Sequence, residues 1–126
     1  ETEDRTEESV EKLRSLQRAD GGWSQLSKMD SDAYATATVL YALAQAGVDA
    51  VDPDYGRGLE YLLDRQLKDG SWHVSTRSDP FQDYFETGFP HGDDQFISTT
   101  ATCWATIALL HALPQKASNE IVPQTD

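Results

Sequence analysis

The sequence has a single cysteine, Cys103, and no uninterrupted apolar run long enough to cross a membrane. One cysteine excludes a disulfide within the chain and leaves the redox compartment undecided. A membrane-spanning helix needs about 20 consecutive apolar residues, so we expect no membrane span.

Basic residues are also scarce. The 10 Lys and Arg residues are outnumbered by 22 Asp and Glu residues, which gives a formal net charge of −12. Neither nucleic acid nor an anionic membrane surface would gain counterion release or attraction from such a chain. We therefore expect no nucleic-acid partner.

An internal repeat is the most informative feature that is present. Residues 17–23 read QRADGGW and residues 66–72 read QLKDGSW, so one seven-residue pattern recurs 49 positions later. Each copy follows a segment whose apolar residues recur with the period of an α-helix. Gly21 and Gly70 can take the left-handed conformation that ends a helix, and each tryptophan then leaves the turn ready to pack. The repeat predicts two equivalent helix–turn units.

Capping signals divide the chain into four helices, which we expect over residues 5–19, 32–46, 53–68 and 99–113. Ser31 or Asp32 can cap the second helix. Asp52 caps the third and precedes Pro53 at its first turn, while Ser98 can cap the fourth. The second and fourth have no charged residue in their interiors, which is typical of buried helices, whereas the first and third carry a charged face. The prediction is an alternation of outer and inner helices, paired antiparallel.

The second copy of the pattern resembles the glutamine–tryptophan motif of squalene–hopene-type cyclases. These cyclases and the protein prenyltransferases share the α/α toroid of the terpenoid cyclase group. The residues that match the motif are Arg57, Gly58, Tyr61, Leu62, Gln66, Gly70 and Trp72. The first copy departs at Lys12, where an aromatic residue is expected. The resemblance implies that each glutamine clamps adjacent outer helices, which is a structural role.

The resemblance also implies an architecture. A closed toroid of this family has five or six helix pairs, whereas this sequence holds two. The expected fold is all-α, with two antiparallel αα-hairpins that form an arc of an α/α toroid over residues 1–113. Residues 114–126 are expected to be a polar C-terminal tail. Because repeat arrays need neighbours at their terminal faces, we expect neighbouring repeats or domains of a longer chain as partners.

No catalytic residue is predicted. Squalene–hopene-type cyclases protonate an alkene with an aspartate of an Asp-x-Asp-Asp-Thr-Ala motif that opens an inner helix. Aligned without gaps, the Asp-Asp pair of that motif falls on residues 34–35, Tyr-Ala, and on residues 100–101, Thr-Ala. Asp30 and Asp32 stand two residues early, and helix capping explains them better. The chain lacks the cyclase acid at both inner helices.

Neither a metal nor a cofactor is predicted. Prenyltransferases of this fold bind zinc through Asp, Cys and His, and this chain has Cys103, His111 and the pair Asp93-Asp94. Cys103 and His111 are eight positions apart on one expected helix. That spacing separates them by about 12 Å along the axis, which is too far to share a metal ion. We expect Cys103 to be a small buried apolar side chain.

The connector over residues 73–97 is 17 residues longer than its counterpart after the first tryptophan. Loops of this length are usually functional or disordered, and five aromatic residues in this one argue against disorder. We expect it to fold over the ends of the inner helices, at the mouth of the family's central cavity. The residues expected to bind an apolar or isoprenoid ligand are Phe81, Tyr84, Phe85, Phe89 and His91. A connector that only covers the open edge of the arc with its aromatic rings is the alternative.

Two functions stay open. One is a non-catalytic repeat module that acts as a scaffold or as a binding surface for an apolar ligand or a partner domain. The other is a part of a terpenoid cyclase-like enzyme whose acid lies in repeats outside this chain. Residues 84–98 also resemble a segment of bacterial proteins of unassigned function that join such repeats to ankyrin or c-type haem domains. That second resemblance implies an extracytoplasmic location and favours the module.

Overall fold

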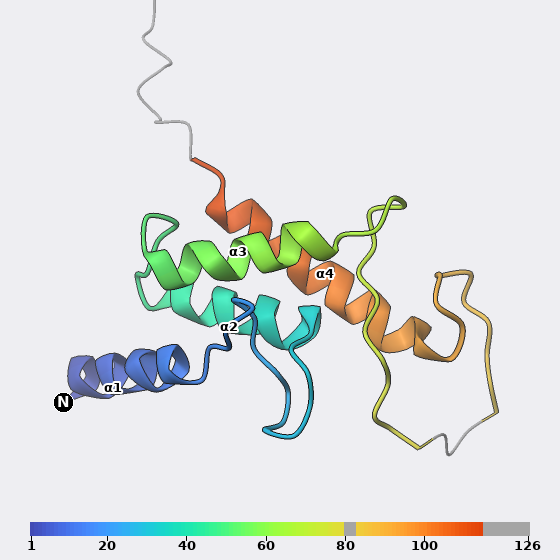
Figure 1. The fold of residues 1–126 in the computed structure, drawn as a ribbon, viewed down its shortest axis with the longest axis horizontal. Helices are drawn as coiled ribbons and strands as arrows, with labels where there is room; N and C mark the ends of the chain where they lie inside the picture. Colours follow the sequence, from blue (N-terminus) through green and yellow to red (C-terminus); the bar gives the residue numbers. More distant parts are fainter. Residues whose placement is uncertain (80–82, 115–126) are drawn as a thin grey trace, which may run out of the picture.

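The computed structural model describes residues 1–79 and 83–114. Its helices are α1 (Thr2–Ser15), α2 (Ala33–Gln45), α3 (Pro53–Arg65) and α4 (Gln95–Ala112), with a 3₁₀ turn, η1 (Gly92–Asp94), directly before α4 (Figure 1). Within the described ranges there is no strand, and the one isolated β-bridge joins Trp23 and Asp32. The prediction of an all-α chain is confirmed. Phe81 and the predicted tail from residue 115 onward lie outside the described residues.

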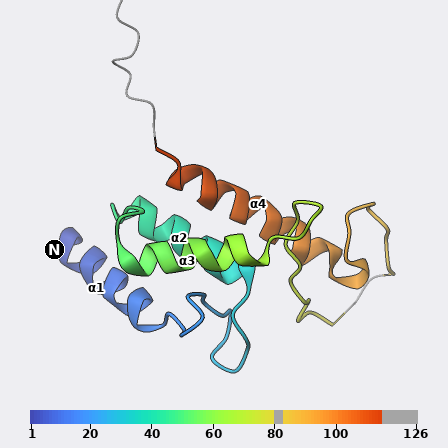
Figure 2. The same cartoon turned by 45° about the horizontal axis from the view of Figure 1, so that its top comes forward.

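The helices run in alternate directions, as the prediction of outer and inner helices requires. α1 and α3 run one way and α2 and α4 run the other, with α2 packed against both α3 and α4 (Figure 1). α1 lies at the edge of the helical assembly in both views (Figure 2). It has no buried residue, and only Val10 and Leu13 reach the core. No helix in the described part of the chain has both the length and the apolar character of a membrane span.

Two aspartates start the central helices where the sequence predicted. Asp32 caps α2, because its carboxylate accepts a hydrogen bond from the backbone N–H of Ala35 at 2.7 Å. Asp52 caps α3 in the same way through the N–H groups of Asp54 and Tyr55, and Pro53 occupies the first helical position. Both caps satisfy N–H groups that a helix leaves without partners at its start.

Four predicted helix boundaries were wrong, and one of them is the start of α1, which lies at Thr2 and not at residue 5. α1 ends at Ser15 and α3 at Arg65, so both motif glutamines lie in turns and not in helices. Each turn forms early because the residue after the glutamine donates its N–H across the turn, from Arg18 to Gly22 and from Leu67 to Ser71, at 2.9 Å in both. α4 begins at Gln95, four residues before its predicted start. Ser98 is therefore not a cap but a residue inside the helix.

The two motif tryptophans lie in equivalent environments, as predicted. The backbone N–H of Trp23 donates to Thr36 Oγ1 on α2, and that of Trp72 donates to Thr102 Oγ1 on α4, both at 3.0 Å. Each indole Nε1–H donates at 2.8 Å to a carbonyl ten residues earlier, on Leu13 or Leu62. The side chains are 2% and 1% exposed. Each tryptophan therefore ties the end of an outer helix to the start of an inner one.

The core lies on both sides of α2. Leu40 and Leu43 of α2 are fully buried, whereas the fully buried apolar residues of α4 are alanines, with larger side chains such as Trp104 packed at the edge of the core. Those alanines are Ala101, Ala105 and Ala108, and none has any exposed surface. Small side chains on one helix allow the axes of two packed helices to approach closely. α2 and α4 are therefore held together mainly by close packing.

The two repeats are also joined by polar contacts between their outer helices. Arg14 donates to both oxygens of Asp52, at 2.7 and 2.8 Å, and to Asp54 at 3.0 Å. Gln17 donates from Nε2 to the carbonyl of Asp54 at 2.8 Å, which is the clamp implied by the family resemblance. Gly21 has φ +87°, and a Cβ there would lie 2.6 Å from the carbonyl oxygen of Arg57. The end of α1 and the turn that follows it are thus hydrogen-bonded to the start of α3.

Replacing Trp72 with alanine should lower the free energy of unfolding by about 3–5 kcal/mol, because a fully buried aromatic side chain is removed. Urea unfolding followed by circular dichroism measures this loss. Leu26→Ala is the control, since Leu26 is 53% exposed and should change stability little. Equal stability of the Trp72 variant and the parent would contradict the structural role of the motif.

Acid should weaken the contact between the repeats. The hydrogen bonds from Arg14, helped by the capped N–H groups, lower the pKa of Asp52 from 3.8 to about 2. A lowered folded-state pKa stabilises the fold above pH 3.8, and that stabilisation is lost as the pH falls toward 2. Asp52→Asn should therefore cost on the order of 1 kcal/mol at neutral pH, given solvent screening of a partly exposed pair.

The same variant should lose less stability than the parent between neutral pH and about pH 3, since its residue 52 no longer titrates. Urea unfolding at the two pH values tests this. Asp64→Asn serves as the control, because Asp64 is an exposed acid on the same helix. Identical acid sensitivity of the Asp52 variant and the parent would show that this ion pair does not couple the repeats.

Candidate functional site

Two fully buried polar side chains at the start of α4 hold the long connector. Gln95 accepts a hydrogen bond from the backbone N–H of Thr87 at 2.8 Å and donates to the carbonyl of Phe85 at 3.2 Å. Ser98 accepts from the N–H of Val74 at 3.0 Å and lies 3.2 Å from the carbonyl of the same residue. Both ends of the connector are therefore fixed to the first turns of α4 in the described part of the chain.

Two stacked histidines join the beginning of the connector to its last part. The rings of His73 and His91 lie 4.6 Å apart at 11°. His73 Nε2 lies 2.7 Å from Asp94 Oδ2, and the other oxygen of Asp94 accepts the N–H of Thr76 at 2.7 Å. These hydrogen bonds, first from the Thr76 N–H and then from His73, lower the pKa of Asp94. Asp94 is thus kept as a carboxylate that orders the connector.

Ser71 adjoins these histidines but is not placed as a nucleophile. Its Oγ lies 3.0 Å from His91 Nε2 and donates to Asp69 Oδ1 at 2.6 Å. A hydroxyl whose proton is already given to a carboxylate cannot give it to a neighbouring base, and Ser71 is also buried. His91 has φ +87°, which is costly for a residue with a side chain, and its ring contacts offset that strain. The contacts of Ser71 therefore link the turn before Trp72 to the connector.

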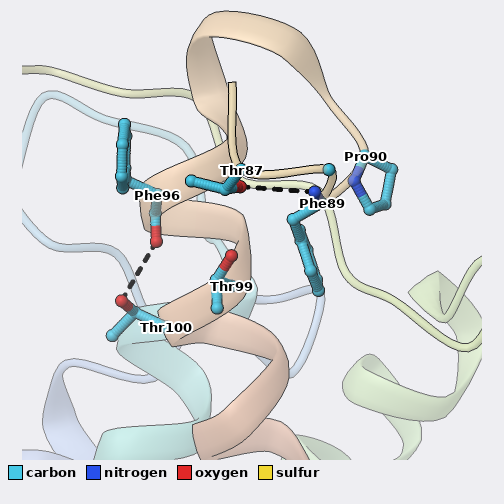
Figure 3. Close-up of a pocket in the computed structure, with 7 residues that line it drawn as sticks. Thr87, Phe89, Pro90, Phe96, Thr99 and Thr100 are labelled. Carbon is cyan, nitrogen blue, oxygen red and sulfur yellow. Dashed lines mark hydrogen bonds between the residues drawn. The ribbon is translucent and has the colours of Figure 1, made fainter. Parts of the chain in front are cut away.

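A hollow of about 620 Å³ opens between the connector and the first turns of α4. It is lined by Thr87, Gly88, Phe89, Pro90, Phe96, Thr99 and Thr100 (Figure 3). Figure 3 shows Thr87, Phe89 and Pro90 on the connector, facing Phe96, Thr99 and Thr100 on the helix. The volume falls within the range of small-molecule sites.

None of the residues that line the hollow is charged, and the hydroxyl protons of its three threonines are donated to acceptors within the protein. Thr99 and Thr100 donate to the carbonyls of Gln95 and Phe96, at 2.7 and 3.1 Å. Thr87 donates from Oγ1 to the side chain of Gln95. The surface therefore offers a ligand two aromatic rings, methyl groups and oxygen lone pairs, and it offers no cation for a phosphate.

The five residues predicted to bind a ligand do not all gather at this hollow. Phe89 lines it and is half-buried. His91 is half-buried beside Phe89, with ring centroids 6.5 Å apart, but it stacks on His73 outside the lining. Tyr84 and Phe85 are 55% and 70% exposed and are not part of the lining. Phe81 lies outside the described residues.

Of the seven lining residues, sequence reasoning predicted only Phe89 and missed six, three of them on the connector, Thr87, Gly88 and Pro90, and three on α4, Phe96, Thr99 and Thr100. It counted Phe96 with the connector and treated the two threonines of α4 only as helix formers. The spacing of Phe96 and Thr100 along the helix could have indicated that they line one surface. Positions 96 and 100 are one turn apart on the same face of α4, and the helix starts early enough to include both.

A second hollow, of about 540 Å³, lies between the two connectors at the start of α2. Its ionisable lining side chains are Lys28, Asp30, Asp32, Arg65 and His73. A cyclase acid would have to stand near here, where an inner helix begins. One oxygen of Asp32 caps α2 and the other accepts from Gln25 at 2.9 Å. Asp32 is thus fully engaged in holding the local structure.

The expectation that Cys103 is buried was wrong, because its side chain is exposed on α4. It faces away from the alanines that pack on α2, so the apolar helix is covered on one side only. Among residues 1–79 and 83–114, no three His, Cys, Asp or Glu side chains come close enough to hold a metal ion. The structure therefore offers no metal site in the part of the chain that it describes.

The two anchors of the connector should act on different segments. Gln95→Leu removes the partners of Thr87 and Phe85, so the Thr87 amide should exchange its hydrogen faster, by about tenfold or more if a net hydrogen bond of over 1 kcal/mol is lost. Ser98→Ala should instead release the Val74 amide. Hydrogen exchange read by NMR checks both, and each variant is the control for the other. Uniform loss of protection in both variants would contradict two separate anchors.

Comparison of the sequence with known proteins identifies the family of the chain. The squalene-hopene cyclase C-terminal domain family matches residues 1–122. Lanosterol synthase erg7A of Aspergillus fumigatus is 32% identical over 107 residues, and a probable squalene–hopene cyclase of Sinorhizobium fredii is 34% identical over 106 residues. These alignments cover 84% and 83% of the chain but only 13% and 15% of the two relatives. The chain belongs to the squalene–hopene cyclase C-terminal domain family, whose fold is the α/α toroid that the resemblance implied.

Proposed function

We propose that this chain is a non-catalytic squalene-cyclase-like repeat module that binds an uncharged apolar ligand in the hollow between the connector and α4. The observation that carries the proposal is the lining itself. Seven uncharged residues line an open hollow of about 620 Å³, and the hydroxyl protons of its threonines are donated within the protein. Such a surface favours hydrocarbon over charged ligands, since it offers apolar contact area and no side chain of opposite charge.

The ligand class follows from size and polarity. The hollow has the volume of a small-molecule site, and the rings of Phe89 and Phe96 provide its apolar walls. The remaining acceptor oxygens suit one hydroxyl donor. An isoprenoid alcohol has this combination, whereas a diphosphate would meet no basic side chain in the lining.

The absence of the cyclase acid supports a non-catalytic role. The positions where the motif acid would stand are occupied by residues 34–35, Tyr-Ala, and 100–101, Thr-Ala. Asp32, the nearest carboxylate on α2, is committed to its cap and to Gln25. A carbocation must also be shielded from water, and the hollow opens to solvent between a loop and a single helix.

A second function is favoured by the comparisons. Both relatives carry the names of cyclases, and the chain spans only 13% and 15% of their lengths. A chain of this family could thus form part of a cyclase-like enzyme whose acid and remaining cavity wall lie in other repeats. In that case the connector would cover the rim of the shared cavity, and the hollow would hold one end of the substrate.

Binding should depend on the aromatic residues that line the hollow. Titration of farnesol, followed by calorimetry, should show binding to the parent protein and at least about tenfold weaker binding to Phe96→Ala, because the Phe96 ring is 57% exposed in the free protein and a bound ligand would cover it, a burial that contributes roughly 1.5–3 kcal/mol when it is complete. Phe85→Ala is the matched control, since Phe85 is a connector aromatic that does not line the hollow. Loss of binding with Phe85→Ala and not with Phe96→Ala would move the site to the outer face of the connector.

The chain alone should form no cyclic product from squalene or farnesyl diphosphate. Incubation with each substrate, followed by product analysis against a no-protein control, tests the non-catalytic proposal directly. Cyclic product above the control would refute the proposal that the chain is non-catalytic. A chain whose acid lies in other repeats would also form no product alone, so the second function is tested by the same assay on a longer chain that contains further repeats.

A further inference from the structure

His73 contacts both ends of the short segment that leads into α4. Its ring stacks on that of His91, with centroids 4.6 Å apart, and its Nε2 lies 2.7 Å from Asp94 Oδ2. His91 directly precedes η1, and Asp94 is the last residue of η1. The backbone N–H of Asp94 also donates to the carbonyl of His91 at 2.9 Å. One side chain at the beginning of the connector therefore holds residues 91–94 from two sides.

The same segment provides part of the wall of the hollow. Phe89 and Pro90 line the hollow and immediately precede His91. The ring of Phe89 lies edge-on to that of His91, with centroids 6.5 Å apart and planes at 64°. His91 has φ +87°, which a residue with a side chain adopts only when its surroundings hold it there. The contacts of His73 thus help to position Phe89, although His73 is not part of the lining.

The hydrogen bonds assign the nitrogen that carries the proton in each neutral imidazole. Asp94 is a carboxylate and only accepts, so His73 donates to it from Nε2. Ser71 gives its one hydroxyl proton to Asp69 at 2.6 Å. The 3.0 Å contact between Ser71 Oγ and His91 Nε2 therefore also needs its donor on the imidazole. Both rings have Nε2–H, and Nδ1 is the atom that gains a proton in acid.

A proton gained by this pair of rings is best held on His73. Its Nε2–H then belongs to an imidazolium that forms an ion pair with Asp94, and a charged donor makes a stronger hydrogen bond to a carboxylate than a neutral one does. The partner of His91 at the same atom is the neutral hydroxyl of Ser71. A second proton would place two cations face to face, and like charges 4.6 Å apart repel. One proton therefore strengthens the contact between His73 and η1, with a charged ring stacked on a neutral one.

The other charges around the two rings stay constant over the range in which histidine titrates. Hydrogen bonds from Ser71 lower the pKa of Asp69, and those from Thr76 and His73 lower the pKa of Asp94, so both acids remain ionised. His73 also lines the second hollow, whose other ionisable groups are two cations and two carboxylates. These are Lys28, Arg65, Asp30 and Asp32. Of all these groups, only the histidines have an ordinary pKa near neutral pH.

We propose that a proton on His73 tightens residues 89–94 against the beginning of the connector and thereby strengthens ligand binding in the hollow. The inference rests on the proposed function, because it concerns the regulation of the same hollow. His73 acts as a positioning residue through His91 and does not touch the ligand. A histidine gains charge as the pH falls through its usual range and loses it as the pH rises. The affinity for the ligand is therefore higher in mild acid than in mild alkali.

The first test needs no ligand. Hydrogen exchange read by NMR gives the protection of the Thr76 and Asp94 amides, which donate to Asp94 Oδ1 and to the His91 carbonyl. Protection relative to an unfolded peptide at the same pH should be about threefold higher at about pH 6 than at about pH 8, the size expected of one partly exposed ion pair. His73→Gln keeps a side-chain N–H for Asp94 without a titrating group and should abolish the difference. His111→Gln, near the other end of α4, is the matched control and should keep it.

The second test measures the affinity for farnesol, whose hydroxyl does not titrate in this range. By calorimetry, the parent and His111→Gln should bind it about threefold more tightly at the lower pH, whereas His73→Gln should bind it equally at both. Asp94→Asn should also remove the difference, because it leaves no carboxylate at His73 Nε2.

Equal binding or equal protection at the two pH values in the parent would overturn the proposal, and so would a difference that survives His73→Gln. Binding of farnesol at neither pH would contradict the proposed function instead. Amide protection that still depends on His73 would then support the response of residues 89–94 to the proton, and protection that does not would overturn it.

Discussion

The structure depends on one interaction that occurs twice, the insertion of a tryptophan between the end of an outer helix and the start of an inner one. Trp23 and Trp72 each donate two hydrogen bonds, one from the backbone to a threonine of the inner helix and one from the indole to a carbonyl of the outer helix. A buried indole leaves its N–H without water, so its position is fixed by the available carbonyl.

Once the helix pairs are fixed, the differences between the repeats determine what the protein can do. The first connector is short and leads directly to the cap of α2 by Asp32. The second is long, and Gln95 and Ser98 fasten it over the first turns of α4. This fastening creates an uncharged hollow at the end of the arc. The proposed ligand site therefore lies on the second repeat.

Local signals in the sequence predicted much of this fold. Asp32 and Asp52 cap helices through contacts within three residues, and the two glycine–tryptophan turns recur with the repeat, so each could be identified without the structure. The hollow could not be predicted in the same way. Gln95 holds residues that are eight and ten positions away, and nothing local distinguishes it from a surface glutamine. Cys103 was misplaced because an apolar composition does not tell which side of a helix is covered.

Hydrogen exchange of the indole N–H protons tests the central claim most directly. If the two turns hold the helix pairs together, the indole protons of Trp23 and Trp72 exchange only when the protein unfolds, as slowly as the slowest backbone amides of α2. Trp104, half-buried on α4, provides the internal comparison. Slow exchange at both motif tryptophans, with faster exchange at Trp104, is the predicted result. Exchange at Trp72 as fast as in an unfolded peptide would contradict the account.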